Sequence, residues 1–167
     1  MDRVAVFEKV SFEQYLADVR KNGAVEESDD ELRAEWEAIK LPTRSTSGSA
    51  GYDFYMPEPS VKCNERPRVV HTGVRCKIKD GWVLVALPRS GMGFKYNMRL
   101  ENTAGVIDAD YYNAENEGHI ALKISSRNEF KIKQGDKFAQ GIFLPFGITE
   151  DDDADGVRTG GFGSTGA

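Results

Sequence analysis

Arg89, Ser90 and Gly91 stand next to one another in the stretch PRSGMGF, directly after an apolar run. An arginine fork, a hydroxyl donor and exposed backbone N–H groups at adjacent positions can together bind a phosphate-like anion. The same residue types also suit an ordinary turn, so this stretch alone does not decide between the two. We expect a tight turn here that carries a compact anion site.

A second group of polar residues surrounds a glycine and two apolar residues in NTAGVIDADYY, which spans residues 102–112. Asp108 follows the apolar pair Val106 and Ile107, and a carboxylate in such a place can hold and deprotonate a water molecule. Asp108 and Asp110, two positions apart, also suit a solvated strand edge. The stretch therefore offers a candidate general base and leaves the structural interpretation open.

The C-terminal stretch GFGSTG, residues 161–166, matches the pattern G-x-G-x-x-G. A dinucleotide fingerprint must follow a strand and open a helix, and only one residue follows here, so we do not expect that function. Glycines still let backbone N–H groups approach an anion, and Ser164 and Thr165 add hydroxyl donors. Arg158 suits a phosphate and Phe162 could stack on a base. The alternative is a frayed terminus.

Short β-rich runs separated by Gly, Pro, Asn and Asp must position these residues. No long helical pattern interrupts the runs after Pro42, so we expect an all-β antiparallel fold, a distorted jelly roll or barrel. Asp53 begins one expected strand and Gln140 lies within another, where it could also pair with backbone. The expected strands are Tyr52 to Met56, Arg68 to Val70, Val74 to Ile78, Trp82 to Leu87, His119 to Ser125 and Lys137 to Phe146.

The chain before Pro42 has a different, helical pattern. Ser11 with Gln14 and Ser28 with Glu31 are two capping-box signals, each followed by apolar residues at helical spacing. Gly23 is expected to end the first helix. We therefore predict one domain in three parts: an N-terminal strand and helical extension (1–42) packed on the core, a β-barrel core (43–148), and an acidic linker with a flexible glycine-rich arm (149–167).

Composition excludes several classes of function. The formal net charge of −5 gives no general attraction to nucleic acid or anionic lipid. No stretch approaches the apolar length of a membrane span, and the first ten residues lack the apolar region of a secretory signal. Cys63 and Cys76 lack metal-ligand spacing and are expected to be reduced thiols on or near strands. We expect a soluble, cytoplasmic protein.

Taken together and in order, five stretches resemble the motifs of the trimeric dUTPase (deoxyuridine triphosphate nucleotidohydrolase) family. They are GSAGYDF, PRSGMGF, NTAGVIDADYY, GDKFAQGIF and RTGGFGSTG, and the resemblance extends from Leu41 to Gly166. It implies hydrolysis of dUTP to dUMP and pyrophosphate with Mg²⁺. It also implies homotrimers of distorted jelly-roll subunits, with three shared active sites and an arm that closes over the nucleotide.

The resemblance also assigns roles to residues. Asp108 activates the attacking water, Tyr111 packs against the deoxyribose and disfavours a 2′-hydroxyl, and Asn102 reads the uracil edge. Asp53 acts near the Mg²⁺ through water. The substrate-binding residues that the resemblance implies are Arg89, Ser90, Gly91, Asn102, Gly105, Val106, Ile107, Tyr111, Gln140, Arg158, Phe162, Gly163, Ser164 and Thr165.

Two departures from the family pattern bear on these roles. The third motif usually has a glycine two residues after the tyrosine, and here Asn113 stands there. Because asparagine tolerates a left-handed conformation, we expect the turn to survive with an insertion. The fifth motif is one residue shorter than the commonest form between Arg158 and its glycines.

Two alternative functions on the same fold stay open for this chain. They are a dCTP deaminase-type enzyme and a nucleotide-dependent binding or regulatory module.

Overall fold

The computed structural model describes residues 2–21, 26–158 and 160, and it confirms the all-β class. Its largest sheet has five antiparallel strands in the order β2-β3-β12-β7-β9, with β9 at one edge. Among the described residues the strands form separate sheets and do not close into a barrel. The five strands are β2 (Thr43–Arg44), β3 (Tyr52–Tyr55), β12 (Lys137–Pro145), β7 (Trp82–Pro88) and β9 (Gly105–Ile107).

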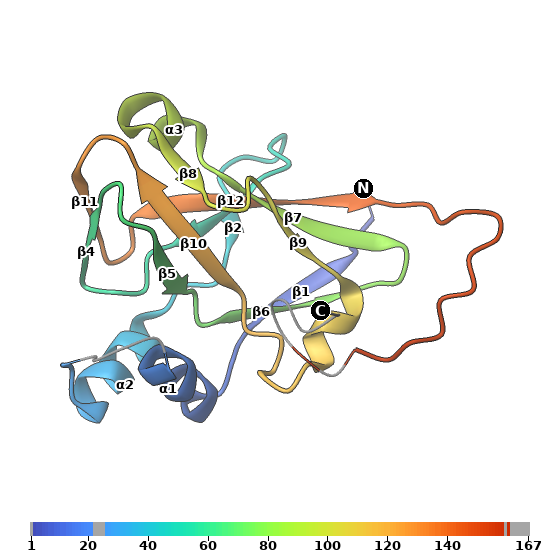
Figure 1. Cartoon of the computed structure of the whole chain (residues 1–167), viewed down its shortest axis with the longest axis horizontal. Helices are drawn as coiled ribbons and strands as arrows, with labels where there is room; N and C mark the ends of the chain where they lie inside the picture. The colour runs from blue at the N-terminus through green and yellow to red at the C-terminus, as the bar shows by residue number, and fades with distance from the viewer. Residues whose placement is uncertain (1, 22–25, 159, 161–167) are drawn as a thin grey trace.

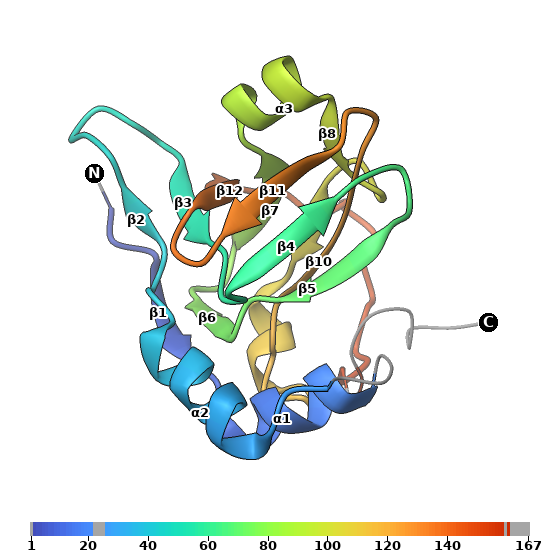
Figure 2. The same cartoon turned by 90° about the vertical axis from the view of Figure 1, so that its left-hand side faces the viewer.

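Three smaller antiparallel sheets complete the described β structure (Figures 1 and 2). A single hydrophobic core draws side chains from all four sheets, including Phe54, Leu84, Val70, Ile132 and Cys76. Burial of this shared core is what holds the sheets together as one unit. The smaller sheets pair β5 (Arg68–His71), β10 (Ala121–Ser126) and β8 (Met98–Leu100), then β11 (Phe130–Lys133) and β4 (Ser60–Cys63), then β1 (Ala5–Lys9) and β6 (Val74–Ile78).

All six strands expected from sequence are present, with ends that differ by two residues at most. The alternation along β10 is as expected, since Leu122 and Ile124 are buried and Lys123 between them is exposed. The expected N-terminal strand is β1, and the expectation missed β2, β4, β8, β9 and β11, which are four residues or shorter. Runs of two to four residues carry few alternating positions, so only some of them stand out in a sequence.

The N-terminal extension contributes strand β1 and the helices α1 (Phe12–Lys21) and α2 (Asp29–Ala38). Strand β1 pairs with β6, and the two helices lie together below the sheets in Figure 1. The capping box of Ser28 and Glu31 is confirmed. That of Ser11 and Gln14 is only half right: the Ser11 hydroxyl accepts from the Gln14 N–H, but the Ser11 N–H donates to Glu117. Gly23 lies outside the described residues.

The tight turn expected at Arg89–Gly91 is instead the start of a short helix, α3 (Ser90–Tyr96), directly after β7. Two glycines give this stretch low helix propensity, which is why the sequence did not show it. The helix is held from outside. The Ser126 hydroxyl and the Asn128 N–H donate to the Tyr96 carbonyl, and the Tyr96 ring stacks on Phe130 with 3.8 Å between ring centres.

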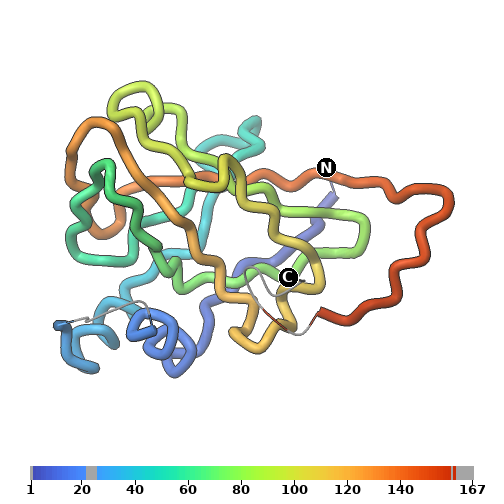
Figure 3. Tube along the Cα trace, in the orientation of Figure 1, coloured from blue at the N-terminus to red at the C-terminus, as the bar shows by residue number. Residues whose placement is uncertain are grey.

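After β12 the acidic segment runs exposed around the side of the molecule and returns toward the short 3-10 helix η1 (Ala109–Asn113) (Figure 3). Arg158 at its end is described and contacts η1 and the residue before it. The arm residues Phe162, Gly163, Ser164 and Thr165 lie outside the described part of the chain. No described helix is long and apolar enough to cross a membrane.

Candidate functional site

Asp53 organises a cluster of positive charge where β3, β7 and β12 meet. It is buried, and its two oxygens lie 2.8 Å from Arg89 Nε and 2.8 Å from Lys137 Nζ. The Ser45 hydroxyl donates to the same carboxylate over 2.8 Å. Burial alone would raise the pKa of Asp53, but Lys137, Ser45 and Arg89 outweigh it and lower the pKa. Two cations against one carboxylate leave net positive charge, which suits an anionic ligand.

Gln140 completes this cluster. It lies opposite Asp53 in the β3–β12 register and opposite Leu87 on β7. Its amide donates to the Pro88 carbonyl over 3.2 Å, which places its side chain against the backbone just before Arg89. A Cβ at Gly51 would come within 2.7 Å of the Gln140 amide oxygen, so a larger residue there would require the Gln140 side chain to move. The structure therefore brings the first, second and fourth sequence motifs together.

Asp108 and Tyr111 belong to a second cluster, which lies just after the C-terminal end of β9. Asp108 follows Ile107 and caps η1, and its carbonyl accepts from the Tyr111 N–H over 3.3 Å. Arg158 Nη2 lies 2.6 Å from an Asp108 oxygen, and its Nε lies 3.0 Å from an Asp110 oxygen. The expected base and the arginine of the fifth motif thus form an ion pair within one chain.

Tyr111 lies buried below that ion pair. Its hydroxyl donates to the His119 carbonyl over 2.8 Å and accepts from the Asn116 amide over 2.9 Å. The Arg158 guanidinium lies 5.7 Å from the centre of its ring. Burial is the main cause of its raised pKa. The ring is therefore fixed by its hydroxyl at one end and lies close to the Arg158 guanidinium.

The two clusters lie apart in a single chain. Ile107, just before Asp108, pairs with Leu84, whereas Arg89 comes five residues after Leu84. At the rise of an extended strand this separates them by about 16 Å. In Figure 1, α3, which follows Arg89, lies at the upper left, and the 3-10 helix that follows Asp108 (yellow) lies at the lower right of the sheets. Between them along the chain, Asn102 lies in an exposed turn and Val106 on β9 is largely exposed.

Comparison with known proteins shows the family of the chain. A sequence model of dUTPase matches residues 37–166. The chain belongs to the dUTPase family. A deoxyuridine 5′-triphosphate nucleotidohydrolase from Lactococcus lactis is 39% identical over 134 residues, which are 77% of this chain and 89% of that protein. One from Escherichia coli O9:H4 is 36% identical over 136 residues, 75% and 87% of the two chains. The dUTPase crystal structure from Streptococcus mutans has a TM-score of 0.63 at 28% identity and covers 86% of this chain and 98% of that one.

The third motif departs from expectation in the position of its left-handed turn. Asn113 ends the 3-10 helix and is not among the described residues with positive φ. The left-handed turn falls instead on Glu117 and Gly118, at φ 57° and 68°. A side chain at Gly118 would come within 2.6 Å of the Tyr111 carbonyl oxygen, so only glycine fits there. The left-handed turn that we expected at Asn113 thus lies at Glu117 and Gly118.

Sequence reasoning missed Lys137 and Ser45 as members of the cluster around Asp53. Lys137 lies three residues before Gln140, and in a regular strand such residues face opposite sides. A register shift between Lys137 and Ala139 puts both on the face of Asp53. Predicting Lys137 would therefore have required predicting this β-bulge, and no residue in the stretch indicates one.

Proposed function

We propose that the chain hydrolyses dUTP to dUMP and pyrophosphate, with Asp108 as general base. The observation that carries the proposal is that Arg158 contacts Asp108 and lies over the Tyr111 ring. Asp108 directly follows the edge strand β9. Curated relatives of this family are named deoxyuridine 5′-triphosphate nucleotidohydrolases. A Staphylococcus phage dUTPase structure contains the nucleotide dUpNHpp.

In the proposed reaction, a water oxygen bonds to the α-phosphorus while the bond from that phosphorus to the bridging oxygen of pyrophosphate breaks. Asp108 takes the proton of the attacking water. For this, the ion pair between Asp108 and Arg158 must first break. The triphosphate offers the Arg158 guanidinium a better partner, because bidentate arginine–phosphate pairs are strong. Exchange of Arg158 from carboxylate to phosphate would free the base only when substrate is present.

The positive cluster of Arg89 and Lys137 is proposed to hold the phosphate chain, together with Ser90, Gly91 and Gln140. Arg89 is fixed by Asp53, so its guanidinium is oriented before substrate arrives. Base recognition is proposed to fall to Asn102 and strand β9. The outer edge of β9 offers backbone donors and acceptors, which can pair with the polar edge of uracil. The arm residues Phe162, Gly163, Ser164 and Thr165 are proposed to cover the bound nucleotide.

Mg²⁺ fits this site as an ion held by the substrate. Both oxygens of Asp53 are engaged by Arg89 and Lys137, so Asp53 can act on the ion through water but does not offer a free direct ligand. Triphosphate oxygens and water are ligands that Mg²⁺ prefers. When bound, it would neutralise charge on the phosphates as pyrophosphate leaves. One related phage dUTPase structure is described as coordinating a structural Mg(II) ion.

Because the two clusters are about 16 Å apart along β7 and β9, one chain does not bring Arg89 to the nucleotide held at Asp108. We therefore propose that the site is shared between subunits of a homotrimer.

We also place the enzyme in the cytoplasm. Cys63 and Cys76 are buried and free, and burial raises the pKa of Cys76 to about 12, as suits inert thiols in a reducing compartment.

The deciding experiment measures pyrophosphate release with Mg²⁺ from dUTP, dCTP, dTTP and UTP at equal concentration. We expect turnover confined to dUTP, because a site built to pair with uracil leaves polar groups unpaired when another base occupies it. Release of ammonia from dCTP would instead indicate a deaminase. Tight binding of dUTP without turnover would contradict the proposal and favour a nucleotide-dependent binding module.

A further inference from the structure

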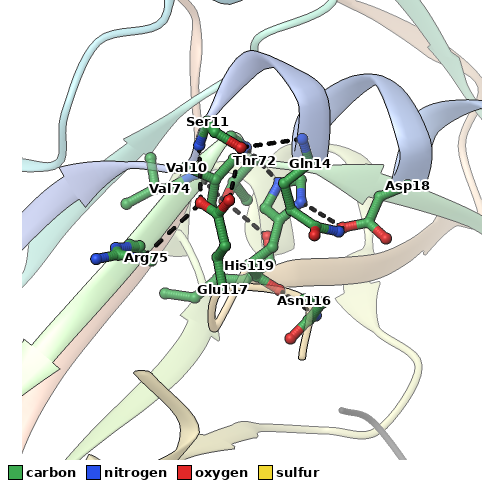
Figure 4. A network of polar contacts seen from close by, with 12 residues as sticks. Val10, Ser11, Gln14, Asp18, Thr72, Val74, Arg75, Asn116, Glu117 and His119 are labelled. Carbon is green, nitrogen blue, oxygen red and sulfur yellow. Dashed lines mark hydrogen bonds and ion pairs between the residues drawn. The ribbon is translucent and has the colours of Figure 1, made fainter. Parts of the chain in front are cut away.

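The N-terminal extension contacts residues 117–119, in the loop that follows Tyr111, through two separate sets of polar contacts (Figure 4). The first set joins Ser11, at the start of α1, to Glu117. The Ser11 N–H donates to Glu117 Oε2 over 2.8 Å, and the Ser11 hydroxyl donates to Oε1 over 2.6 Å. Burial would raise the pKa of Glu117, but the two Ser11 contacts, Arg75 and His119 lower it. The carboxylate therefore accepts from Ser11 as a charged partner.

The second set joins Asp18, on α1, to His119. Asp18 Oδ2 lies 2.7 Å from His119 Nδ1, and His119 Nε2 accepts from the Gly73 N–H over 2.8 Å. Because Nε2 is an acceptor, a neutral imidazole must carry its proton on Nδ1 and donate it to Asp18. Burial would raise the pKa of Asp18, but the hydrogen bonds from His119 and Gln14 lower it. Asp18 is thus a charged acceptor for a buried imidazole.

This arrangement also excludes a metal at the same place. Ligand atoms of Asp18, His71 and His119 lie within 4.8 Å of one another, which is close enough for a shared ion. Both nitrogens of His119 are already engaged, one as an acceptor and one as a donor, so neither has a free lone pair. The cluster serves as a hydrogen-bonded link between α1 and the loop.

The link reaches Tyr111 directly. The carbonyl of the same His119 accepts the Tyr111 hydroxyl over 2.8 Å. The turn at Gly118 lies so close to the backbone of Tyr111 and Tyr112 that a Cβ there would come within 2.6 Å and 2.8 Å of their atoms. Displacing residues 117–119 would therefore move the tyrosine as well, since a close-packed contact transmits displacement.

We propose that the N-terminal extension, through Asp18 and Ser11, is a positioning device for Tyr111 and sets the discrimination against a 2′-hydroxyl. The family match begins at residue 37, so these two residues lie outside the matched part of the chain. The inference rests on the proposed function, in which Tyr111 faces the deoxyribose. Asp18 and Ser11 act here as positioning residues only, because they contact the loop and not the nucleotide.

The test compares Asp18→Ala with Glu13→Ala, a matched control that removes an exposed carboxylate from the same helix. The readout is kcat/KM for dUTP divided by kcat/KM for UTP in the full chain. We expect the ratio to fall about tenfold in D18A, which corresponds to about 1.4 kcal/mol of lost discrimination. E13A should keep the ratio. In D18N the amide oxygen can still accept from His119, so most of the discrimination should return.

A second arm needs no activity. Amide hydrogen exchange of residues 108–119 without nucleotide should quicken in D18A and in Ser11→Ala, and stay unchanged in E13A. A slow-exchanging loop with an unchanged ratio in D18A would overturn the proposal, and so would D18N behaving like D18A in a folded protein. If the unaltered chain does not hydrolyse dUTP, the proposed function fails. In that case unchanged exchange in D18A would overturn the link to the loop as well.

Discussion

At the residue scale, the ion pair between Asp108 and Arg158 gives the sharpest prediction. Asp108→Asn keeps the shape of the side chain but removes its ability to take a proton. We expect kcat to fall by a factor of about 10² to 10⁴, the usual contribution of a general base. Binding of the analogue dUpNHpp, measured by calorimetry, should remain, because the proposed phosphate site at Arg89 and Lys137 is unchanged.

The control for Asp108 is its neighbour Asp110, which also contacts Arg158 but is not expected to touch the water. Asp110→Asn should keep a turnover close to that of the unaltered chain. Equal activity in D108N would remove the assignment of the base. Equal losses in D108N and D110N would mean that the pair of carboxylates acts only by holding Arg158.

From the sequence, Asp108, Arg89 and Gln140 could be chosen as candidates because each stands inside a motif. It could not predict partners from distant segments. Asp18 and His119 are 101 positions apart, and each alone is an ordinary polar residue in its own element. Their meeting depends on how α1 docks beside β5 and the residues before β10, which is a tertiary fact that no local pattern encodes.

At the element scale, Asp53 ties β3 to the end of β7 and the start of β12, and this gives a prediction about pH. Its pKa is lowered in the folded protein. The stabilisation is therefore fully present above its ordinary value of 3.8 and is lost as the pH falls through the folded pKa. The free energy of unfolding should fall more steeply on the acid side for the unaltered chain than for Asp53→Asn.

Urea denaturation at several pH values between neutral and acid measures that difference. Glu31→Gln is a useful comparison, because Glu31 also has a lowered pKa but lies exposed in the capping box of α2, away from the positive cluster. D53N should also raise KM for dUTP, since Arg89 loses its anchor, whereas E31Q should not. An acid-side difference of the same size in both variants would mean that the Asp53 cluster has no special part in stability.

Elements of regular pattern were predictable, and elements held by their neighbours were not. Strand β10 alternates cleanly and was expected, whereas α3 contains Gly91 and Gly93 and depends on contacts from Ser126 and Phe130. One signal for α3 was present. Asn97 ends it in a left-handed conformation, and asparagine is a residue that helices accept at that position. That signal was too weak against the low propensity of the helix itself.

At the scale of the whole molecule, the separation of Arg89 from Asp108 gives the last prediction. If the site is shared between subunits, a chain with Arg89→Ala still offers an intact Asp108, and a chain with D108N still offers an intact Arg89. Each variant alone should be nearly inactive. When equal amounts are dissociated together and reassembled, random mixing should restore about one quarter of the sites, because each site needs one intact contribution from each of two chains.

The matched control mixes D108N with Asp108→Ala, which can restore nothing because every chain then lacks the base. Light scattering on each preparation shows whether the variants assemble, so that a failure to fold is not taken for a failure to share. Recovery in the first mixture and none in the second would require that Arg89 and Asp108 of different chains meet at one nucleotide. No recovery between correctly assembled variants would mean that a single chain closes the distance by itself. The positive cluster at Asp53 would then serve something other than the triphosphate held at Asp108.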